Sequence, residues 1–127
     1  MKLNRLITLS LLAILSLTMS IGCKKKVDTF AVVVVKNNAN GLVAGANVLL
    51  KAEGTTTDPS SINTAIFPMS AVSDSEGKAT FNFNEVYQVG QAGVAVLTIE
   101  VVAGSKTGQG VIKVEQEQTT EEVVFVI

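Results

Sequence analysis

The sequence predicts an all-β fold, a seven-stranded antiparallel β-sandwich behind an N-terminal signal peptide. Three observations lead to this prediction. Apolar and polar residues alternate with the two-residue period of strands, most cleanly over residues 78–84. Clusters of Gly, Asn, Asp, Ser and Thr separate these segments at short intervals. Helical periodicity is absent after residue 22.

The first three predicted strands lie in the N-terminal half of the domain. Residues 30–36, FAVVVVK, form a β-branched run that could be buried on both faces of its sheet. The dipeptide Asn40-Gly41 then provides a strong hairpin signal. Residues 46–51 place alternate apolar side chains on one face, and residues 65–73 form the third strand. Pro68 in that segment indicates an edge strand or a bulge.

Four more strands complete the predicted sandwich. Residues 78–84 direct alternate apolar side chains inward, and residues 94–103 form the longest strand. The glycines at 104, 108 and 110 follow, and we interpret them as turn glycines. The sixth strand is expected at residues 111–116 and the last at residues 123–127.

Residues 1–22 have the pattern of a secretory signal peptide. Lys2 and Arg5 carry the only charges, and residues 6–22 are uncharged. A membrane-spanning helix needs about 20 predominantly apolar residues. Here hydroxyl residues dilute an uncharged run of 17 positions. A positive start, an apolar run and a small residue before the cleavage point instead indicate a signal that is removed.

The end of this segment, Ser20-Ile21-Gly22-Cys23, resembles the lipobox of bacterial lipoproteins. Ser20 and Ile21 replace the usual Leu and the usual Ala or Ser, whereas Gly22 fits the small position before the cut. The resemblance implies cleavage between Gly22 and Cys23 and attachment of a diacylglycerol to the Cys23 thiol. Membrane lipid is therefore an expected partner, through acylated Cys23.

Three lysines follow Cys23, at positions 24–26. They either contact anionic headgroups or form a solvated charge run, and the sequence leaves both readings open. A tether of about 4 residues reaches only about 13 Å, so we expect the domain close to the bilayer. Lys24 directly after the cysteine resembles the outer-membrane default of lipoprotein sorting. We favour the periplasmic face over the cell surface.

Three motifs in residues 28–127 resemble one domain family. Residues 41–48, GLVAGANV, resemble its G-x-P-V-x-G-A-x-V stretch, with the proline replaced around Val43. Residues 73–81, SDSEGKATF, resemble its T-D-x-x-G-x-A-x-F hairpin, and residues 116–121 its approach to the last strand. The family is the carboxypeptidase-regulatory-like, or transthyretin-like, domain. The resemblance implies a sandwich of transthyretin-like or immunoglobulin-like type.

Composition limits the chemistry that the chain can perform. There are 10 Lys+Arg against 11 Asp+Glu, no His and one Cys. The near-zero charge argues against nucleic acid, and one Cys excludes an internal disulfide or a thiolate zinc cluster. The missing His removes the commonest general base. We therefore expect no enzyme, no catalytic or metal site, and no cofactor.

Several acidic side chains are candidates for a metal or catalytic site. Asp74 and Glu76 with Asp58 offer too few oxygens for calcium, and we favour a role for Asp74 in binding the amides of its own turn. Glu115 with Glu117, or Glu121 with Glu122, resemble a glycosidase pair only in sequence. We favour solvated charges for all four.

The expected role is a non-catalytic interaction or structural module in the cell envelope, with an envelope protein as partner. The alternative is a small-ligand or glycan-binding module that uses loops 53–64 and 84–93, the longest irregular segments. Tyr87 in the second loop either stacks on a sugar or packs at the end of the sandwich, and we favour packing.

Overall fold

The computed structural model of the chain describes residues 3–4, 22, 25–52, 68–86 and 94–127. Seven strands lie in these ranges: β1 (Phe30–Asn37), β2 (Asn47–Ala52), β3 (Met69–Val72), β4 (Lys78–Asn82), β5 (Val94–Ala103), β6 (Lys106–Glu115) and β7 (Thr119–Val126). The predicted all-β class is thus confirmed for the described part of the chain.

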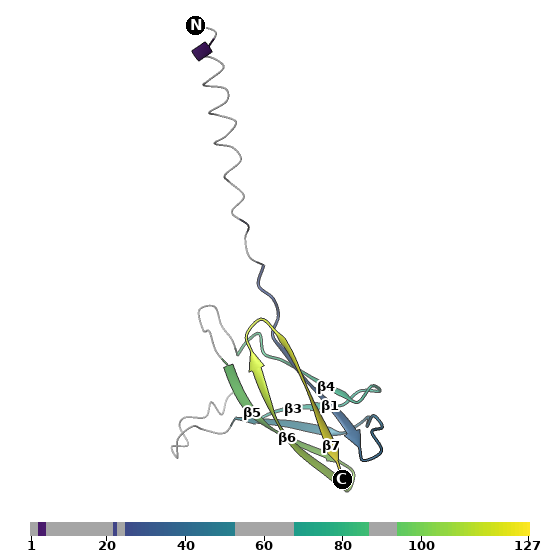
Figure 1. Ribbon diagram of the computed structural model, residues 1–127. Coiled ribbons are helices and arrows are strands. Elements are labelled where there is room, and N and C mark those ends of the chain that lie inside the picture. Colours follow the sequence, from purple (N-terminus) through teal and green to yellow (C-terminus); the bar gives the residue numbers. More distant parts are fainter. Residues whose placement is uncertain (1–2, 5–21, 23–24, 53–67, 87–93) are drawn as a thin grey trace, which may run out of the picture.

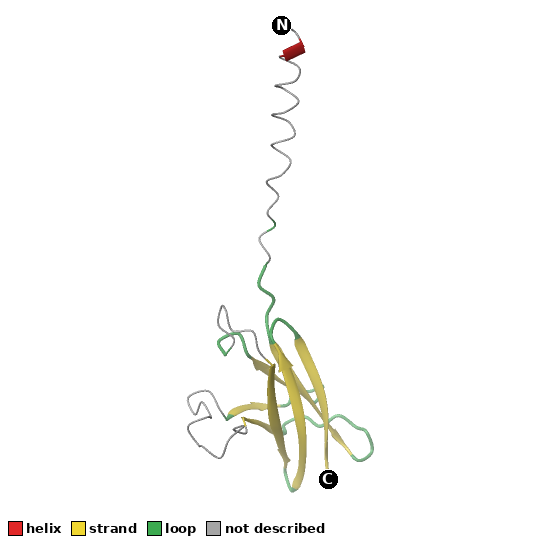
Figure 2. Cartoon of the chain, turned by 60° about the vertical axis from the view of Figure 1, so that its left-hand side comes forward, coloured by secondary structure: helices red, strands yellow, loops and turns green. Residues whose placement is uncertain are grey.

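The strands form two sheets (Figures 1 and 2). One sheet has the order β4-β1-β7 and the other has the order β3-β2-β5-β6. The second sheet is antiparallel throughout. In the first, β1 pairs antiparallel with β4 but parallel with β7, from Phe30 opposite Thr119 to Asn37 opposite Val126. The prediction of a wholly antiparallel fold is therefore wrong at this pair, because pairing direction leaves no mark on a strand's own residues.

The inner faces of both sheets contribute to one hydrophobic core. The largest side chains with less than 2 % exposure are Phe83, Leu50, Leu97, Ile99 and Ile112. These residues occupy the alternate positions that the sequence assigns to the inner face. Packing of the two inner faces gives the molecule a β-sandwich-like architecture.

The β-branched run of β1 is covered more fully on one face than on the other. Ala31, Val33 and Val35 lie on the inner face and are completely buried. On the outer face Val34 is also buried, whereas Phe30 and Val32 are only half-buried. The expected burial on both faces is thus reached at Val34, where the strand is central in its sheet.

The edge strands β6 and β7, one from each sheet, approach each other. The amide of Thr107 donates to the carbonyl of Ile127 at 3.1 Å, and the amide of Ile127 donates back at 3.0 Å. A Cβ at Gly108 would overlap the carbonyl oxygen of Phe125, and one at Gly110 would lie 3.0 Å from Val124 Cγ2. The two glycines therefore allow a close approach between the sheets.

This arrangement corrects the interpretation of the three glycines. Only Gly104 lies in the turn, where it has φ +63° and leads directly through Ser105 into β6. Glycine at the first central position is typical of a two-residue hairpin of type II′. Gly108 and Gly110 belong to β6, which begins five residues before the predicted strand at 111.

Three other strands depart from the predicted bounds by more than one residue. Strand β7 begins at Thr119 rather than at 123, because its polar first half pairs with β1. Strand β4 ends at Asn82 rather than at 84. Strand β3 is confined to Met69–Val72; the rest of the predicted segment before Pro68 lies outside the described residues. As Pro68 indicates, β3 is an edge strand.

The Asn-Gly turn after β1 leads the chain from one sheet to the other. Asn37 Oδ1 accepts from the amides of Ala39 and Gly41, both at 2.9 Å. The positive φ lies at Asn40 (65°) and not at Gly41. Leu42 then bridges back to Lys36, after which Gly45 (φ 73°) turns the chain into β2 of the second sheet. The turn signal was correct, but the strand that follows is not the hairpin partner of β1.

Candidate functional site

The segment before β1, where the sequence predicts a membrane attachment, is the candidate site. Lys25, Lys26, Val27 and Asp28 are exposed and leave the sheets at the end opposite the C-terminus (Figures 1 and 2). Gly22 is exposed, and Cys23 lies outside the described residues. Within the described ranges no helix has the length and apolar character needed to cross a membrane.

The first buried residue after this tether is Thr29. It is 2 % exposed, and its amide donates to Asn84 Oδ1 at 2.8 Å. Its carbonyl accepts from the amide of Phe83 at 2.9 Å. Asn84 Nδ2 donates in turn to Asp28 Oδ1 at 3.0 Å. These bonds hold the start of the domain against the residues that follow β4.

Thr29 is also fixed to the β6–β7 turn. Its Oγ1 accepts from the amide of Glu117 at 2.8 Å, and the neighbouring amide of Phe30 donates to Gln118 O at 3.1 Å. Glu117 has φ 60°, so the turn holds a non-glycine residue in the left-handed region. One buried threonine therefore joins three segments. Sequence reasoning missed it, because its partner is 88 positions away and leaves no local signal.

A corner of the second sheet lies beside this attachment point. Val94 and Val96 of β5 and Val111 of β6 are 55 %, 61 % and 57 % exposed on its outer face. Lys113 of β6 is paired in register with Val96 of β5 and lies two residues after Val111 on its own strand. We call the set Val94, Val96, Val111 and Lys113 the tether-side corner.

Lys113 forms an ion pair along its own strand. Its Nζ lies 2.6 Å from Glu115 Oε1. The hydrogen bond from Lys113, assisted by its charge, holds the pKa of the Glu115 carboxyl below its usual range. Both side chains remain solvated, at 60 % and 34 % exposure, so the pair adds little to stability.

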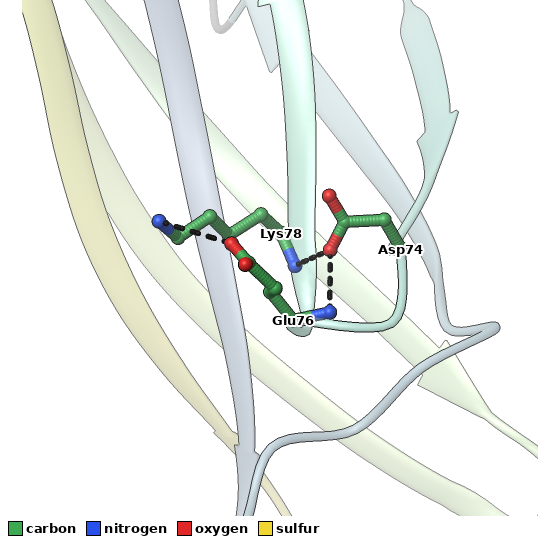
Figure 3. Close-up of polar contacts among 3 residues, drawn as sticks. All are labelled: Asp74, Glu76 and Lys78. Atoms are coloured by element: carbon green, nitrogen blue, oxygen red, sulfur yellow. Dashed lines mark hydrogen bonds and ion pairs between the residues drawn. The ribbon is translucent and has the colours of Figure 1, made fainter.

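The acidic turn at residues 74–78, between β3 and β4, is held by its own amides (Figure 3). Asp74 Oδ1 accepts from the amides of Glu76 at 2.8 Å and Lys78 at 3.0 Å. The amide of Gly77, which has φ 72°, donates to the carbonyl of Asp74 at 2.9 Å. The predicted role of Asp74 in its own turn is therefore confirmed.

No group of three potential metal-ligating side chains occurs in the described residues. Asp58, the third member of the calcium hypothesis, lies outside them. Glu76 is directed to Lys78, with 3.6 Å between the carboxylate and Nζ (Figure 3).

A second buried polar residue, Ser73, joins β3 to the segment before β2. Its Oγ accepts from the amide of Ala46 at 2.9 Å and donates to the carbonyl of Val43 at 2.7 Å. The amide of Gly45 donates to the carbonyl of Ser73 at 2.9 Å. Ser73 thus stabilises the connection in which the chain passes from one sheet to the other before β2. The sequence offers only its place before the Asp74 turn as a signal.

The paired carboxylates are not arranged as the sequence spacing suggests. Glu115 ends β6, whereas Glu117 lies in the turn that follows, so the two do not share a strand face. Glu121 and Glu122 are consecutive on β7 and alternate between its faces, and both are exposed. Glu122 is two positions from buried Val124 and therefore lies on the same, inner side of β7. This places a charge on the inner side of an edge strand.

The two loops proposed as a ligand site fall largely outside the described residues. All of loop 53–64 does, and so does loop 84–93 from Tyr87 onward. Their described flanks are Ala52 and Pro68 for the first, and Val86 and Val94 for the second. The strand pairing puts these flanks at the same ends of the strands as Phe30 and Glu115.

Neither the models of known protein families nor the curated protein sequences contain a match to this chain.

Proposed function

We propose that the protein is a lipid-anchored lipoprotein of the bacterial cell envelope, with a transthyretin-like β-sandwich that serves as a non-catalytic interaction module. Acylated Cys23 is the membrane attachment, on the strength of its lipobox-like context. The short chain from Cys23 to buried Thr29 supports a domain held near the bilayer. The outer membrane, with the domain on its periplasmic side, is the location that Lys24 favours.

One observation carries the interaction role: apolar side chains gather at the end of the sandwich remote from the tether. Leu42 (54 % exposed) and Phe125 (50 %) flank Lys36 in one row across β1. Val123 (38 %) is next on β7, and the C-terminal Ile127 is 76 % exposed. A soluble surface seldom gathers large apolar side chains without a partner. An anchored domain presents this end away from its own membrane, where an envelope protein can reach it.

The anchor is tested by fractionating cells that express the full chain with Cys23→Ala. This variant should leave the membrane fraction or accumulate as an uncleaved precursor. Ser20→Leu, which restores the usual lipobox residue, is the matched control and should fractionate with membranes. A Cys23→Ala protein that stays in the membrane at the normal processed size would refute the anchor.

The interaction role is tested by photo-crosslinking in intact cells. A photoreactive phenylalanine replaces Phe125 in one variant and the exposed Thr80 of β4, on the same sheet, in the other. Phe125 should give one dominant protein adduct that Thr80 does not give. Lipid adducts alone, or the same adducts from both positions, would contradict the module. Adducts confined to a small molecule would favour ligand binding instead.

A further inference from the structure

We propose that the tether-side corner lies against the lipid bilayer, so that the domain is held in one orientation by its own surface as well as by its anchor. This inference rests on the proposed lipid attachment at Cys23 and extends it. The corner is defined above by Val94, Val96, Val111 and Lys113, and its occupant is the headgroup region of the membrane that holds Cys23.

The geometry of the corner fits a membrane surface. Val96 lies in register with Lys113, and Val111 is two residues from Lys113 on the same face of β6. Strand β6 is the edge of its sheet, and β5 begins at Val94. Val94 and Val96 therefore lie at the corner, and Val111 lies halfway along the edge strand β6, so a tilt of the domain toward this edge brings the three valines onto a plane.

The length of the tether makes this contact attainable. Five residues separate Cys23 from buried Thr29, a reach of about 18 Å at ~3.6 Å per residue. Thr29 Oγ1 is hydrogen-bonded to Glu117, and Lys113 is four residues before Glu117. The chain between Lys113 and Glu117 spans at most about 13 Å at ~3.3 Å per residue, because β6 ends at Glu115 and the chain then turns. The anchor can thus reach the membrane plane without lifting the corner from it.

The charges near the tether point to an apolar contact. The sequence there carries Lys24, Lys25, Lys26 and Lys113 against Asp28, Glu85, Glu115 and Glu117. These charges cancel, and Lys113 is already paired with Glu115. Attraction to anionic lipid therefore contributes little, and the exposed valines supply the contact. The Lys113 stem adds apolar surface while its ammonium stays in the wet headgroup layer.

The same sheet face offers an internal comparison. Val72 (59 %) and Val102 (47 %) are exposed on the outer face of this sheet as well. They face each other across Asn47, at the opposite ends of the strands. The outer face of this sheet therefore has exposed valines both in the tether-side corner and at the opposite end. Only the valines of the tether-side corner should contact lipid.

The test uses the full chain, processed and acylated at Cys23, so that the only free thiol is an introduced one. Val96→Cys and Val111→Cys probe the corner, and Val102→Cys is the matched control. Each is labelled with an environment-sensitive fluorophore and reconstituted into phosphatidylcholine vesicles that carry a spin-labelled lipid quencher. Flotation of the vesicles is recorded for each sample.

We expect quenching at positions 96 and 111 to exceed that at 102 by about twofold or more, as for groups within the interfacial layer. It should persist in about 1 M salt, where charges are screened beyond roughly 3 Å. Equal quenching at all three positions in floated vesicles would overturn the contact and leave the anchor intact. A blue-shifted but unquenched label would instead assign the corner to a second copy, which also overturns it. Loss of flotation would refute the anchor, and the contact with it.

Discussion

Gly108 and Phe125 touch through their backbones, and this contact closes one side of the sandwich. A Cβ on Gly108 would overlap the carbonyl oxygen of Phe125 and lie 2.9 Å from Val124 Cγ1. The hydrogen bonds between Thr107 and Ile127 are immediately adjacent. Any residue other than glycine must therefore push β7 away from β6.

Gly108→Ala should destabilise the mature chain by about 3 kcal/mol, because backbone and not a flexible side chain stands in the way. The measurement is chemical denaturation followed by circular dichroism. Gly110→Ala is the control: its Cβ meets a side-chain methyl, Val124 Cγ2, at 3.0 Å and not backbone, so a smaller loss of about 1 kcal/mol is expected. Equal losses for the two variants would contradict the close backbone approach.

Ser73→Ala should lower the free energy of unfolding by about 1–3 kcal/mol. The reason is that the amide of Ala46 and the carbonyl of Val43 lose their partner, and Ala46 is fully buried. Ser70→Ala, on the exposed face of β3, should change stability by no more than about 0.5 kcal/mol. Chemical denaturation of the two variants measures both free energies of unfolding. An unchanged free energy for Ser73→Ala would show that these hydrogen bonds do not stabilise the connection between the sheets.

Thr29→Val keeps the shape of the side chain but removes the acceptor for the amide of Glu117. The β6–β7 turn should open more often, and hydrogen exchange at the Glu117 amide should accelerate about tenfold for a loss of ~1.4 kcal/mol. Thr80→Val, exposed on β4, serves as control. Unchanged exchange at Glu117 would mean that the turn does not depend on Thr29.

The Lys113–Glu115 pair predicts a pH effect. Lys113→Ala should raise the pKa of Glu115 toward the ordinary glutamate value of about 4.3, since the hydrogen bond and charge that lower this pKa are removed. Because the pKa of Glu115 is lower in the folded chain than in the unfolded chain, the ionised carboxylate stabilises the fold at pH values above the pKa of the unfolded chain. This contribution is lost as the pH falls through the pKa of the folded chain. Titration of the Glu115 carboxyl by NMR measures the change, with Lys106→Ala as control. A pKa that does not move would contradict the pairing.

The sequence predicted the strands well where one side chain in two is apolar. Strand β5 has the predicted bounds, and Leu50, Phe83 and Ile112 are buried as the two-residue period requires. The prediction failed where a strand lacks that signal. Thr119–Glu122 is polar, and the first half of β6 contains Gly108 and Gly110. Both segments are nevertheless strands, because the first pairs with β1 and the second with β5.

The candidate site was predictable only where its chemistry is local. Asp74 binds amides two and four residues away, and its turn was foreseen from Asp and Gly alone. Thr29 and Ser73 bind partners 88 and 27 positions away, so nothing nearby in the sequence marks them. The corner valines look like ordinary strand residues, and only the pairing of β5 with β6 shows that they meet Lys113.

The parallel pairing of β1 with β7 also determines how the domain carries a load. The chain enters β1 at the anchored end and leaves β7 at the opposite end, with eight register pairs between the two strands. If a partner pulls on the region of Ile127 while the membrane holds Cys23, the two strands are drawn past each other lengthwise. Their hydrogen bonds must then yield together and not one after another. Under the proposed anchoring, the β1–β7 pair would therefore bear tension in shear across all eight register pairs.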